Sequence, residues 1–459
     1  MKQTLLKMSP KEALLIAALI VGVMGVTIIS FEWVPHLSIL LVLCGLMMFG
    51  GLRGITFNAM RDQMASGVLS GIGAIYLFSF IGLLVSALMM SGAIPTLMYY
   101  GFELISPNYF YLSAFLLTAI IGIAIGSSLT TCATLGVAFI GMTEAFQANP
   151  AITAGAVVSG AFFGDKMSPL SDTTAIAASI VGIDLFEHIR NMMYTTVPAL
   201  LLSAGLFWVL GGQTAHADLN SIASMKQQLW ASGLIHVYTL IPFAVLVVLA
   251  MRKVNAIYTI IATVVVALLI TYIHSTPNMK DLGGWFFAGY KPIADLGGVN
   301  SLLSRGGIQS MFFTQTIVIL ALSLGGLLHA LGILPALLEG IRHLLTTAGR
   351  ATLSVASTAL GVNILIGEQY LSLMLAGETF KPVYDKLQLH PRNLARTLED
   401  AGTVINPLVP WSVCGVFISH ALGVAVLDYL PYAFFCYLCL ILTLLFGFSG
   451  VTISKQEQA

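Results

Sequence analysis

Charged residues are scarce in this chain. Only 9% of its 459 residues are Asp, Glu, Lys or Arg, whereas 58% are hydrophobic. The 20 basic and 20 acidic side chains balance, so no basic excess favours a nucleic-acid partner. Mean hydropathy of +0.93 and repeated apolar runs of about 20 residues instead indicate an integral membrane protein whose solvent is the lipid bilayer.

Patterns for disulfides, zinc and common hydrolytic chemistry are also lacking. None of the five cysteines belongs to a CxxC…CxxC pair of motifs or to a Cys/His set that could build a zinc site, and disulfides are not expected. Cys436 and Cys439 share one face of an apolar helix and are expected to pack there. No Gly-x-Ser-x-Gly or His-Glu-x-x-His motif occurs. An enzyme is therefore disfavoured, and no cofactor is expected.

The N-terminus resembles a signal peptide only superficially. Its lysines precede an apolar run over 13–29, but no small-x-small cleavage site follows, so we expect a retained first span. The positive-inside rule then places the N-terminus in the cytoplasm of a bacterial-type cell, with the chain in the cytoplasmic membrane. The basic residues that support this orientation are Lys2, Lys7, Lys11, Arg53, Arg61, Arg252, Lys253, Arg342 and Arg350. Three others, Lys280, Lys291 and Arg305, would lie outside and spoil the pattern.

Apolar runs predict the membrane spans. Several are too short to cross about 30 Å of hydrocarbon, which indicates re-entrant or discontinuous helices in an all-α polytopic membrane protein. The predicted spans are 13–30, 34–51, 68–90, 94–105, 110–125, 132–147, 152–163, 192–211, 232–251, 255–274, 308–330, 332–345, 351–366, 370–384, 393–405, 410–424 and 427–448.

A polar island over 164–174 interrupts this pattern. It holds two aspartates, one lysine and four hydroxyls between apolar flanks, and such groups at membrane depth usually serve function. Pro169 removes a backbone donor and Gly164 loosens the chain, which predicts an unwound helix junction. A direct pair between Asp165 and Lys166 would require that unwinding, because neighbours on a helix point to different faces. Alternatively, Lys166 extends to the membrane interface.

The two halves of the chain show weak internal similarity. Ser91–Pro95 matches Leu331–Pro335 about 240 residues later, and Gly164-Asp165 is matched with Glu399-Asp400. Interrupted hydrophobic segments at matching places in two halves point to the binding site of a transporter. We expect oppositely oriented repeats over 1–212 and 232–450, a connector over 213–231 and a tail over 451–459.

The first half offers a candidate cation site. Hydroxyls and freed carbonyls are hard oxygen ligands that suit a desolvated alkali cation, and a carboxylate supplies the neutralising charge. Because a buried carboxylate can hold either a proton or a cation, Asp165 and Asp172 are the predicted Na⁺ ligands. Alternatively, the hydroxyls merely allow close helix packing. The predicted binding residues are Ser127, Ser128, Thr130, Thr131, Asp165, Ser168, Asp172, Thr173 and Thr174.

The second half offers a matching set of polar residues around its own breaks. Arg396 lies one helical turn before Asp400, so a structural pair between them is an alternative to ion binding by Asp400. Trp411 is either a wall of the site or an interfacial residue. The predicted binding residues are Glu368, Gln369, Glu399, Asp400, Thr403, Asn406 and Trp411.

These motifs resemble the NhaC-type Na⁺/H⁺ antiporter family. Gly-Asp-Lys-Met-Ser-Pro-Leu-Ser-Asp-Thr-Thr at 164–174, with Leu-Glu-Asp-Ala-Gly-Thr at 398–403 and Leu-Val-Pro-Trp at 408–411, carries the resemblance, which extends over essentially the whole chain. The resemblance implies an inverted-repeat ion-transporter fold, a homodimer and an elevator-like movement. The family also includes exchangers that couple Na⁺ and H⁺ to carboxylates such as malate and lactate.

Three positions depart from the pattern that the resemblance implies. Family members usually have asparagine at the positions of Ala175 and Ser412, and serine at the position of Ala401. Each change removes an amide or a hydroxyl that could contact ion or substrate.

Two transport functions follow as expectations. The first is secondary antiport of Na⁺ against H⁺; the second is Na⁺- or H⁺-coupled exchange of a small organic acid or amino acid, whose carboxylate could bind at a helix N-terminus. Interrupted helices in both halves suit alternating access better than a continuous channel.

Overall fold

The computed structural model describes residues 4–211, 219–292, 300, 303–341 and 346–456. Within these residues the chain is helical, and its strand-like pairing is limited to one bridge between Leu389 and Lys455. Seven of the described helices are long and apolar enough to cross a membrane, or up to ten if each bent pair counts as one span. The prediction of an all-α polytopic membrane protein is therefore confirmed.

Eleven α-helices lie within residues 4–211. They are α1 (Pro10–Gly25), α2 (Pro35–Leu52), α3 (Phe57–Ser70), α4 (Ile72–Met90), α5 (Ala93–Leu104), α6 (Phe110–Ile125), α7 (Ser128–Thr131), α8 (Val137–Met142), α9 (Pro150–Met167), α10 (Asp172–Val181) and α11 (Leu185–Gly211). Two π-helical turns, η1 (Val26–Ser30) and η3 (Cys132–Gly136), continue α1 and join α7 to α8.

The second half of the chain also combines long and short helices. Its described elements are α12 (Leu219–Ala231), α13 (Ile241–Met251), α14 (Ala256–His274), α15 (Met279–Ala288), α17 (Ile308–Ala330), α18 (Ile333–Ile341), α19 (Ala348–Ile366), α20 (Gln369–Lys386), α21 (Pro391–Leu398), the π-helical turn η7 (Glu399–Thr403), α22 (Val413–Leu422), α23 (Val426–Tyr429) and α24 (Phe434–Ser449).

Hydropathy located most of these helices but missed three. The predicted span over 68–90 is α4, and the more polar α3 precedes it as a separate helix. Helix α12 lies in the expected connector, of which 213–218 falls outside the described residues, and α15 lies in the long loop before α17. The expected span over 332–345 is described only as far as the end of α18. Hydropathy does not detect polar helices such as α12, because it reports only apolar runs.

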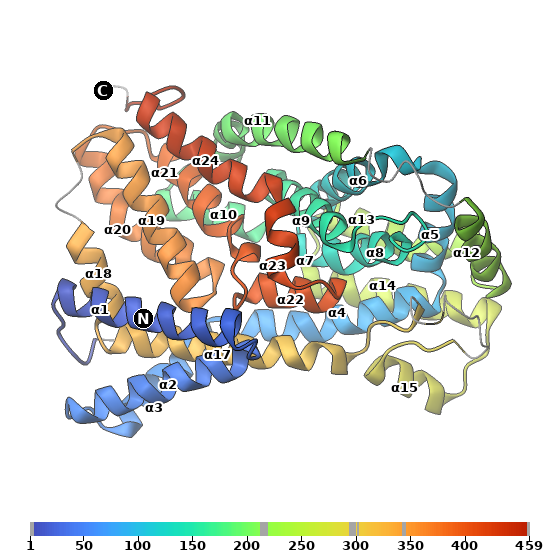
Figure 1. The fold of residues 1–459 in the computed structure, drawn as a ribbon, viewed down its shortest axis with the longest axis horizontal. Coiled ribbons are helices and arrows are strands. Elements are labelled where there is room, and N and C mark those ends of the chain that lie inside the picture. Colours follow the sequence, from blue (N-terminus) through green and yellow to red (C-terminus); the bar gives the residue numbers. More distant parts are fainter. Residues whose placement is uncertain (1–3, 212–218, 293–299, 301–302, 342–345, 457–459) are drawn as a thin grey trace.

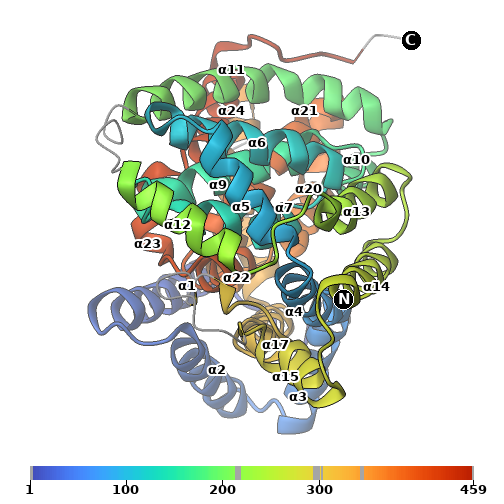
Figure 2. The ribbon, with the colours of Figure 1, turned by 90° about the vertical axis from the view of Figure 1, so that its right-hand side faces the viewer.

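The long helices enclose a middle layer of short, broken ones. In both views α1, α2, α3 and α17 lie along one edge and α11 and α24 along the opposite edge (Figures 1 and 2). The short helices α7, α10 and α22 lie between these edges, together with the longer α20. Broken helices are stable at membrane depth only where protein or water satisfies their free backbone groups, and this central position provides that protection.

The same local chemistry starts a broken helix in each half. Gly126 and Gly367 end α6 and α19 with φ of 69° and 78°, a left-handed conformation that glycine adopts without a steric penalty. The next residue then caps a new helix: the Ser127 hydroxyl accepts from the Thr130 amide at 3.3 Å, and the Glu368 carboxylate accepts from the Leu371 amide at 2.7 Å.

The predicted unwound junction in the polar island is confirmed. Helix α9 ends at Met167 and α10 begins at Asp172, with extended backbone at Ser168 and Ser171. The Ser171 hydroxyl caps α10 by accepting from the Thr174 amide at 3.4 Å.

Several element boundaries of the two halves recur at one spacing. Four pairs of positions are 241 residues apart: Gly126 and Gly367, Pro150 and Pro391, Ser171 and Ser412, and Gly182 and Gly423. The same spacing sets Asp165 opposite Asn406, whereas we predicted from the sequence that it matches Asp400.

A close helix crossing positions the first aspartate. Helices α6 and α9 pack at Gly122 and Gly164, where a Cβ atom on Gly164 would lie 2.5 Å from the Cα of Gly122. Small residues let helix backbones approach closely inside a membrane. Because Asp165 follows Gly164, this contact fixes its backbone beside the break after α6.

Candidate functional site

Asp165 lies at the N-terminus of α7. Its side chain is 4% exposed, and its Oδ2 accepts two hydrogen bonds from Ser128, at 3.0 Å from the amide and 2.7 Å from the hydroxyl. Its Oδ1 has no hydrogen-bond partner among the described residues. The carboxylate is thus held by neutral donors and the positive end of a helix, while one oxygen remains available.

Lys166 points away from Asp165 and reaches the second half. It forms an ion pair with Asp400, and both side chains are fully buried. The Thr195 hydroxyl also donates to Asp400 Oδ1 at 3.3 Å, and Lys166 Nζ lies 3.7 Å from Cys439 Sγ. Both sequence-based alternatives for Lys166 are therefore wrong: it neither pairs with Asp165 nor extends to the interface. Cys439 packs as expected, but it does so against a buried charge.

Arg396 is not the partner of Asp400. Its Nη1 donates to the Thr452 hydroxyl at 3.0 Å, so the alternative pair suggested by helical spacing does not form. Three carboxylate oxygens in η7 lack hydrogen-bond partners among the described residues: Oδ2 of Asp400 and both side-chain oxygens of Glu399. The Thr403 hydroxyl also has none there. The predicted binding residues of η7 are thus buried together, and several of their oxygen atoms have no hydrogen-bond partner among the described residues.

An amide network supports the second-half break. Asn363 Nδ2 donates to the carbonyl of Gly402 at 2.6 Å, and its Oδ1 accepts from Asn406 Nδ2 at 2.9 Å. Asn406 Oδ1 in turn accepts from the Cys414 amide at 3.0 Å. These bonds join α19, η7 and the start of α22. Asn363 is not among the binding residues predicted from the sequence, although an amide inside the apolar run over 351–366 was the available signal.

Asp172 links the first half to the cap of α20. Its Oδ2 accepts from the Tyr370 hydroxyl at 2.5 Å, and its Oδ1 accepts from the Thr173 amide at 2.9 Å. Unlike Asp165, Asp172 is exposed. The two predicted Na⁺ ligands thus lie in different surroundings: Asp165 is buried at the N-terminus of α7, and Asp172 is exposed.

Two clefts open beside these residues. The Ser127 cleft, with a volume of about 420 Å³, is lined by Ser127, Thr130, Asp172, Lys253 and Asn255 together with apolar side chains. The Glu368 cleft, of about 480 Å³, is lined by Leu129, Asp172, Asn255, Glu368, Gln369, Tyr370 and Cys414 among others. Asp172 and Asn255 border both clefts. Ser128, which donates two hydrogen bonds to Asp165, stands in the chain between the lining residues Ser127 and Leu129, so Asp165 lies against the first turn of α7.

Most of the remaining predicted hydroxyls hold backbone at the breaks. The Ser168 hydroxyl donates to the Ile123 carbonyl at 2.7 Å, and the Thr174 hydroxyl donates to the Lys166 carbonyl at 3.2 Å. The Thr131 hydroxyl donates to the Ser127 carbonyl at 2.8 Å, and that of Thr173 bonds with Ser171 at 3.0 Å.

Trp411 and Ser412 also support the backbone. Trp411 is 6% exposed, and its indole nitrogen donates to the Ile364 carbonyl at 2.6 Å. The Ser412 hydroxyl donates to the Asn406 carbonyl at 2.5 Å and accepts from the Gly415 amide at 2.9 Å. Of the two other departures from the family pattern, Ala175 is exposed and Ala401 is buried.

The donor set suits an alkali cation better than a transition metal. Within the described residues, no group of three His, Cys, Asp or Glu side chains is arranged to hold a metal ion. Single carboxylates with nearby hydroxyl and carbonyl oxygens are hard ligands for weakly held cations. Buried carboxylates behind polar clefts, together with helices broken in both halves, define a secondary transporter.

Comparison with known proteins identifies the family. A model of the Na⁺/H⁺ antiporter family matches residues 160–451. The chain is 39% identical over 457 residues to the Na⁺/H⁺ antiporter NhaC of Alkalihalophilus pseudofirmus, covering 98% of each chain. It is 39% identical over 425 residues to NhaC of Bacillus subtilis, covering 90% of this chain and 92% of the relative. It is also 35% identical over 401 residues to the arginine/ornithine antiporter ArcD of Halobacterium salinarum, covering 86% and 83%. The chain belongs to the Na⁺/H⁺ antiporter family.

Proposed function

We propose that the protein exchanges Na⁺ for H⁺ across the cytoplasmic membrane, with Asp165 as the carboxylate that binds each ion in turn. One observation carries this proposal: Asp165 is buried, its Oδ2 is fixed by Ser128, and its Oδ1 is unpartnered among the described residues. A buried carboxylate without a cationic partner favours either a proton or a bound cation. Exclusive binding of one or the other is the minimal requirement for antiport.

Charge pairing distinguishes Asp165 from Asp400. Lys166 neutralises Asp400 in the described conformation, so a cation would have to displace or compete with that lysine. Asp165 faces only neutral donors. Asp400 is therefore the second candidate, and Asp172 is the carboxylate that borders both clefts, so a cation that enters either one can meet it.

The proposed orientation places both clefts on the cytoplasmic side. Lys253 and Asn255, in the loop between α13 and α14, line the Ser127 cleft, and the positive-inside rule favours the cytoplasm for this loop. The described conformation would then face inward. We further propose that the two halves are inverted repeats, that the N-terminus is cytoplasmic, and that the protein acts as a homodimer; the matched breaks after α6 and α19 support the repeats.

Proteoliposomes with an internal pH-sensitive dye test the proposed exchange. After a pH gradient is imposed, added Na⁺ should dissipate it in vesicles with the unmodified protein, and added K⁺ serves as the ion control. Asp165→Asn should reduce the Na⁺-driven rate to that of empty vesicles. Asp62→Asn makes the same chemical change on the exposed surface of α3 and should leave the rate unchanged. Full activity of Asp165→Asn would refute the assignment.

Amino-acid exchange is a second candidate function. The two clefts are much larger than a single Na⁺, and one relative is named an arginine/ornithine antiporter. The carboxylates of Asp172 and Glu368 in the larger cleft favour a cationic solute over an organic acid. Uptake of labelled arginine, ornithine and malate, each with and without Na⁺, separates the functions. Na⁺-driven proton movement without uptake of any labelled solute would exclude this candidate.

A further inference from the structure

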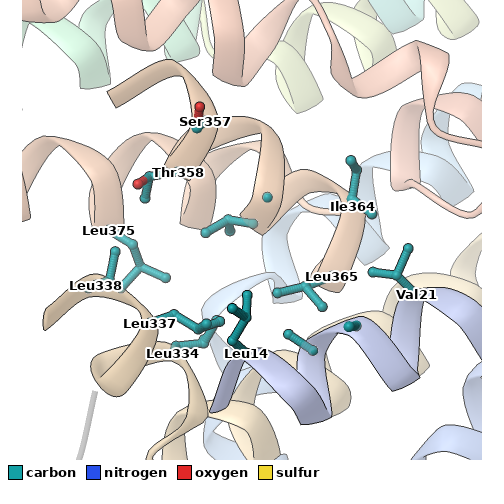
Figure 3. Close-up of a pocket in the computed structure, with 14 residues that line it drawn as sticks. Leu14, Val21, Leu334, Leu337, Leu338, Ser357, Thr358, Ile364, Leu365 and Leu375 are labelled. Carbon is teal, nitrogen blue, oxygen red and sulfur yellow. The ribbon is translucent and has the colours of Figure 1, made fainter. Parts of the chain in front are cut away.

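An apolar groove lies between the N-terminal helix and the second half. Its volume is about 390 Å³, and its walls come from α1, α18 and α19, with Leu375 of α20 at one end. Figure 3 shows Leu14, Leu334 and Leu365 facing one another from these three helices. Only Ser357 and Thr358 bring hydroxyl groups to the lining.

Small residues leave the groove unfilled. A Cβ atom on Gly361 would meet no atom within 4 Å, although this glycine lies in the middle of α19. On the facing helix, the lining residues Ala17 and Ala18 are equally short. Protein interiors are normally close-packed, so we expect another molecule to fill a groove of this volume between helices.

The position of the groove identifies the chemistry of that occupant. Helices α1 and α19 both belong to candidate membrane spans, and only 28% of the most apolar 18-residue stretch of Pro10–Ser30 is buried, against 61% of that of Ala348–Ile366. Leu14, which lines the groove, is 64% exposed. The groove therefore opens at the depth of the lipid hydrocarbon. We propose that an acyl chain of an anionic phospholipid occupies it as a specifically bound lipid.

The two ends of the groove differ in polarity. Thr358 lies with Leu338 and Leu375 at one end, and Val21 lies at the other (Figure 3). The Thr358 side chain is 6% exposed and its hydroxyl has no partner among the described residues, so it can donate to a lipid ester carbonyl. Because α1 runs from Leu14 toward Val21, its N-terminus lies toward the Thr358 end.

Basic side chains at this end match an anionic headgroup. Lys7 and Lys11 are exposed just before and within the first turn of α1, and Lys11 lies on the helix face of Leu14. Glu12 does not cancel them, because it is paired with Arg53. The exposed Glu339 at the end of α18 offsets one of the two lysines, which leaves a net positive end. Lysines at a membrane surface attract anionic lipids.

The bound chain would support the helix that organises the candidate site. Val362 and Ile364 line the groove and flank Asn363, whose amide holds the backbone of η7. The Ile364 carbonyl also accepts from Trp411. Filling the groove with a lipid chain would therefore stabilise α19 from the side opposite its site contacts.

Lipid-dependent thermal stability tests the proposal. The full-length protein is delipidated in detergent and melted with added dioleoyl phosphatidylglycerol or dioleoyl phosphatidylcholine, which share acyl chains and differ in headgroup charge. Phosphatidylglycerol should raise the melting temperature by at least about 3 °C, and by more than phosphatidylcholine does. Gly361→Leu fills the groove and should abolish this rise. Gly45→Leu, at another open helix position outside the groove, is the matched control and should retain it.

A second groove-filling variant keeps the test possible if Gly361→Leu does not fold. Ala18→Leu fills the same groove from α1, and it should also abolish the rise. An undiminished rise in a folded groove-filling variant would overturn the proposal. Equal rises with the two lipids would overturn the assignment of an anionic lipid, and no rise with either lipid would overturn the site itself.

Discussion

Lys166 on α9 and Asp400 in the π-helical turn η7 form a fully buried ion pair that joins the two halves of the chain. The neighbouring Asp165 points the other way, to the start of α7. The last turn of α9 therefore carries opposite charges with different surroundings: the lysine has a carboxylate partner, and the aspartate has neutral donors. This difference is the physical basis for assigning the ion-binding role to Asp165.

Removing only one member of the buried pair should destabilise the protein. Lys166→Met leaves Asp400 as an uncompensated buried charge, and we expect the free energy of unfolding to fall by about 3–5 kcal/mol. The measurement is unfolding of the purified protein in detergent micelles, followed by circular dichroism.

The double variant Lys166→Met/Asp400→Leu provides the control for that experiment. It removes both charges, so most of the lost stability should return. A double variant as unstable as Lys166→Met would show that shape or packing at Lys166 matters more than its charge. The cycle of single and double variants measures the coupling between the two side chains directly.

Tyr370→Phe should weaken the interaction of Na⁺ with the cleft. The substitution removes the hydroxyl that donates to Asp172 Oδ2, so the carboxylate loses its fixed orientation beside Glu368. A hydrogen bond to a charged group contributes about 1.5–3 kcal/mol, so an increase of roughly tenfold or more in the apparent KM for Na⁺ is expected. Tyr258→Phe, on the exposed side of α14, is the control. An unchanged KM would remove Asp172 from the proposed entry path.

Gly164→Ala should disturb the crossing of α6 and α9. The added methyl group would meet the backbone at Gly122, which cannot move aside as a flexible side chain can. Overpacking of this kind costs about 1–3 kcal/mol, which a lower melting temperature would reveal. Gly205→Ala is the matched control, because its Cβ position has no neighbour within 4 Å. Equal melting temperatures for the two variants would contradict the close crossing.

The sequence was informative where the signal was local. Pro169 and Gly164 predicted the junction between α9 and α10, and Asp165 and Lys166 of the island are buried beside it. The glycines before Ser127 and Glu368 likewise marked the starts of α7 and α20. These features depend on backbone sterics and capping over a few residues, which a single sequence records directly.

Long-range pairing was the part that sequence could not supply. Asp165 was the sequence neighbour of Lys166, and a pair between them required an unwound backbone, whereas helical spacing favoured a pair between Arg396 and Asp400. The actual partners are 234 residues apart, and their contact depends on how α9, α11, α21 and α24 pack. Asn363 escaped notice for a related reason, because its role arises only from backbone groups of η7.

We propose that Na⁺ and H⁺ compete for the same carboxylate, Asp165. Equilibrium binding of radioactive Na⁺ to the purified protein, measured over a series of pH values, tests it most directly. Competition with one proton predicts that the apparent Kd for Na⁺ increases about tenfold for each unit of decreasing pH in the acidic range, and that Asp165→Asn loses this dependence with the site. A Kd that does not change with pH, or pH-dependent binding retained by Asp165→Asn, would contradict the claim.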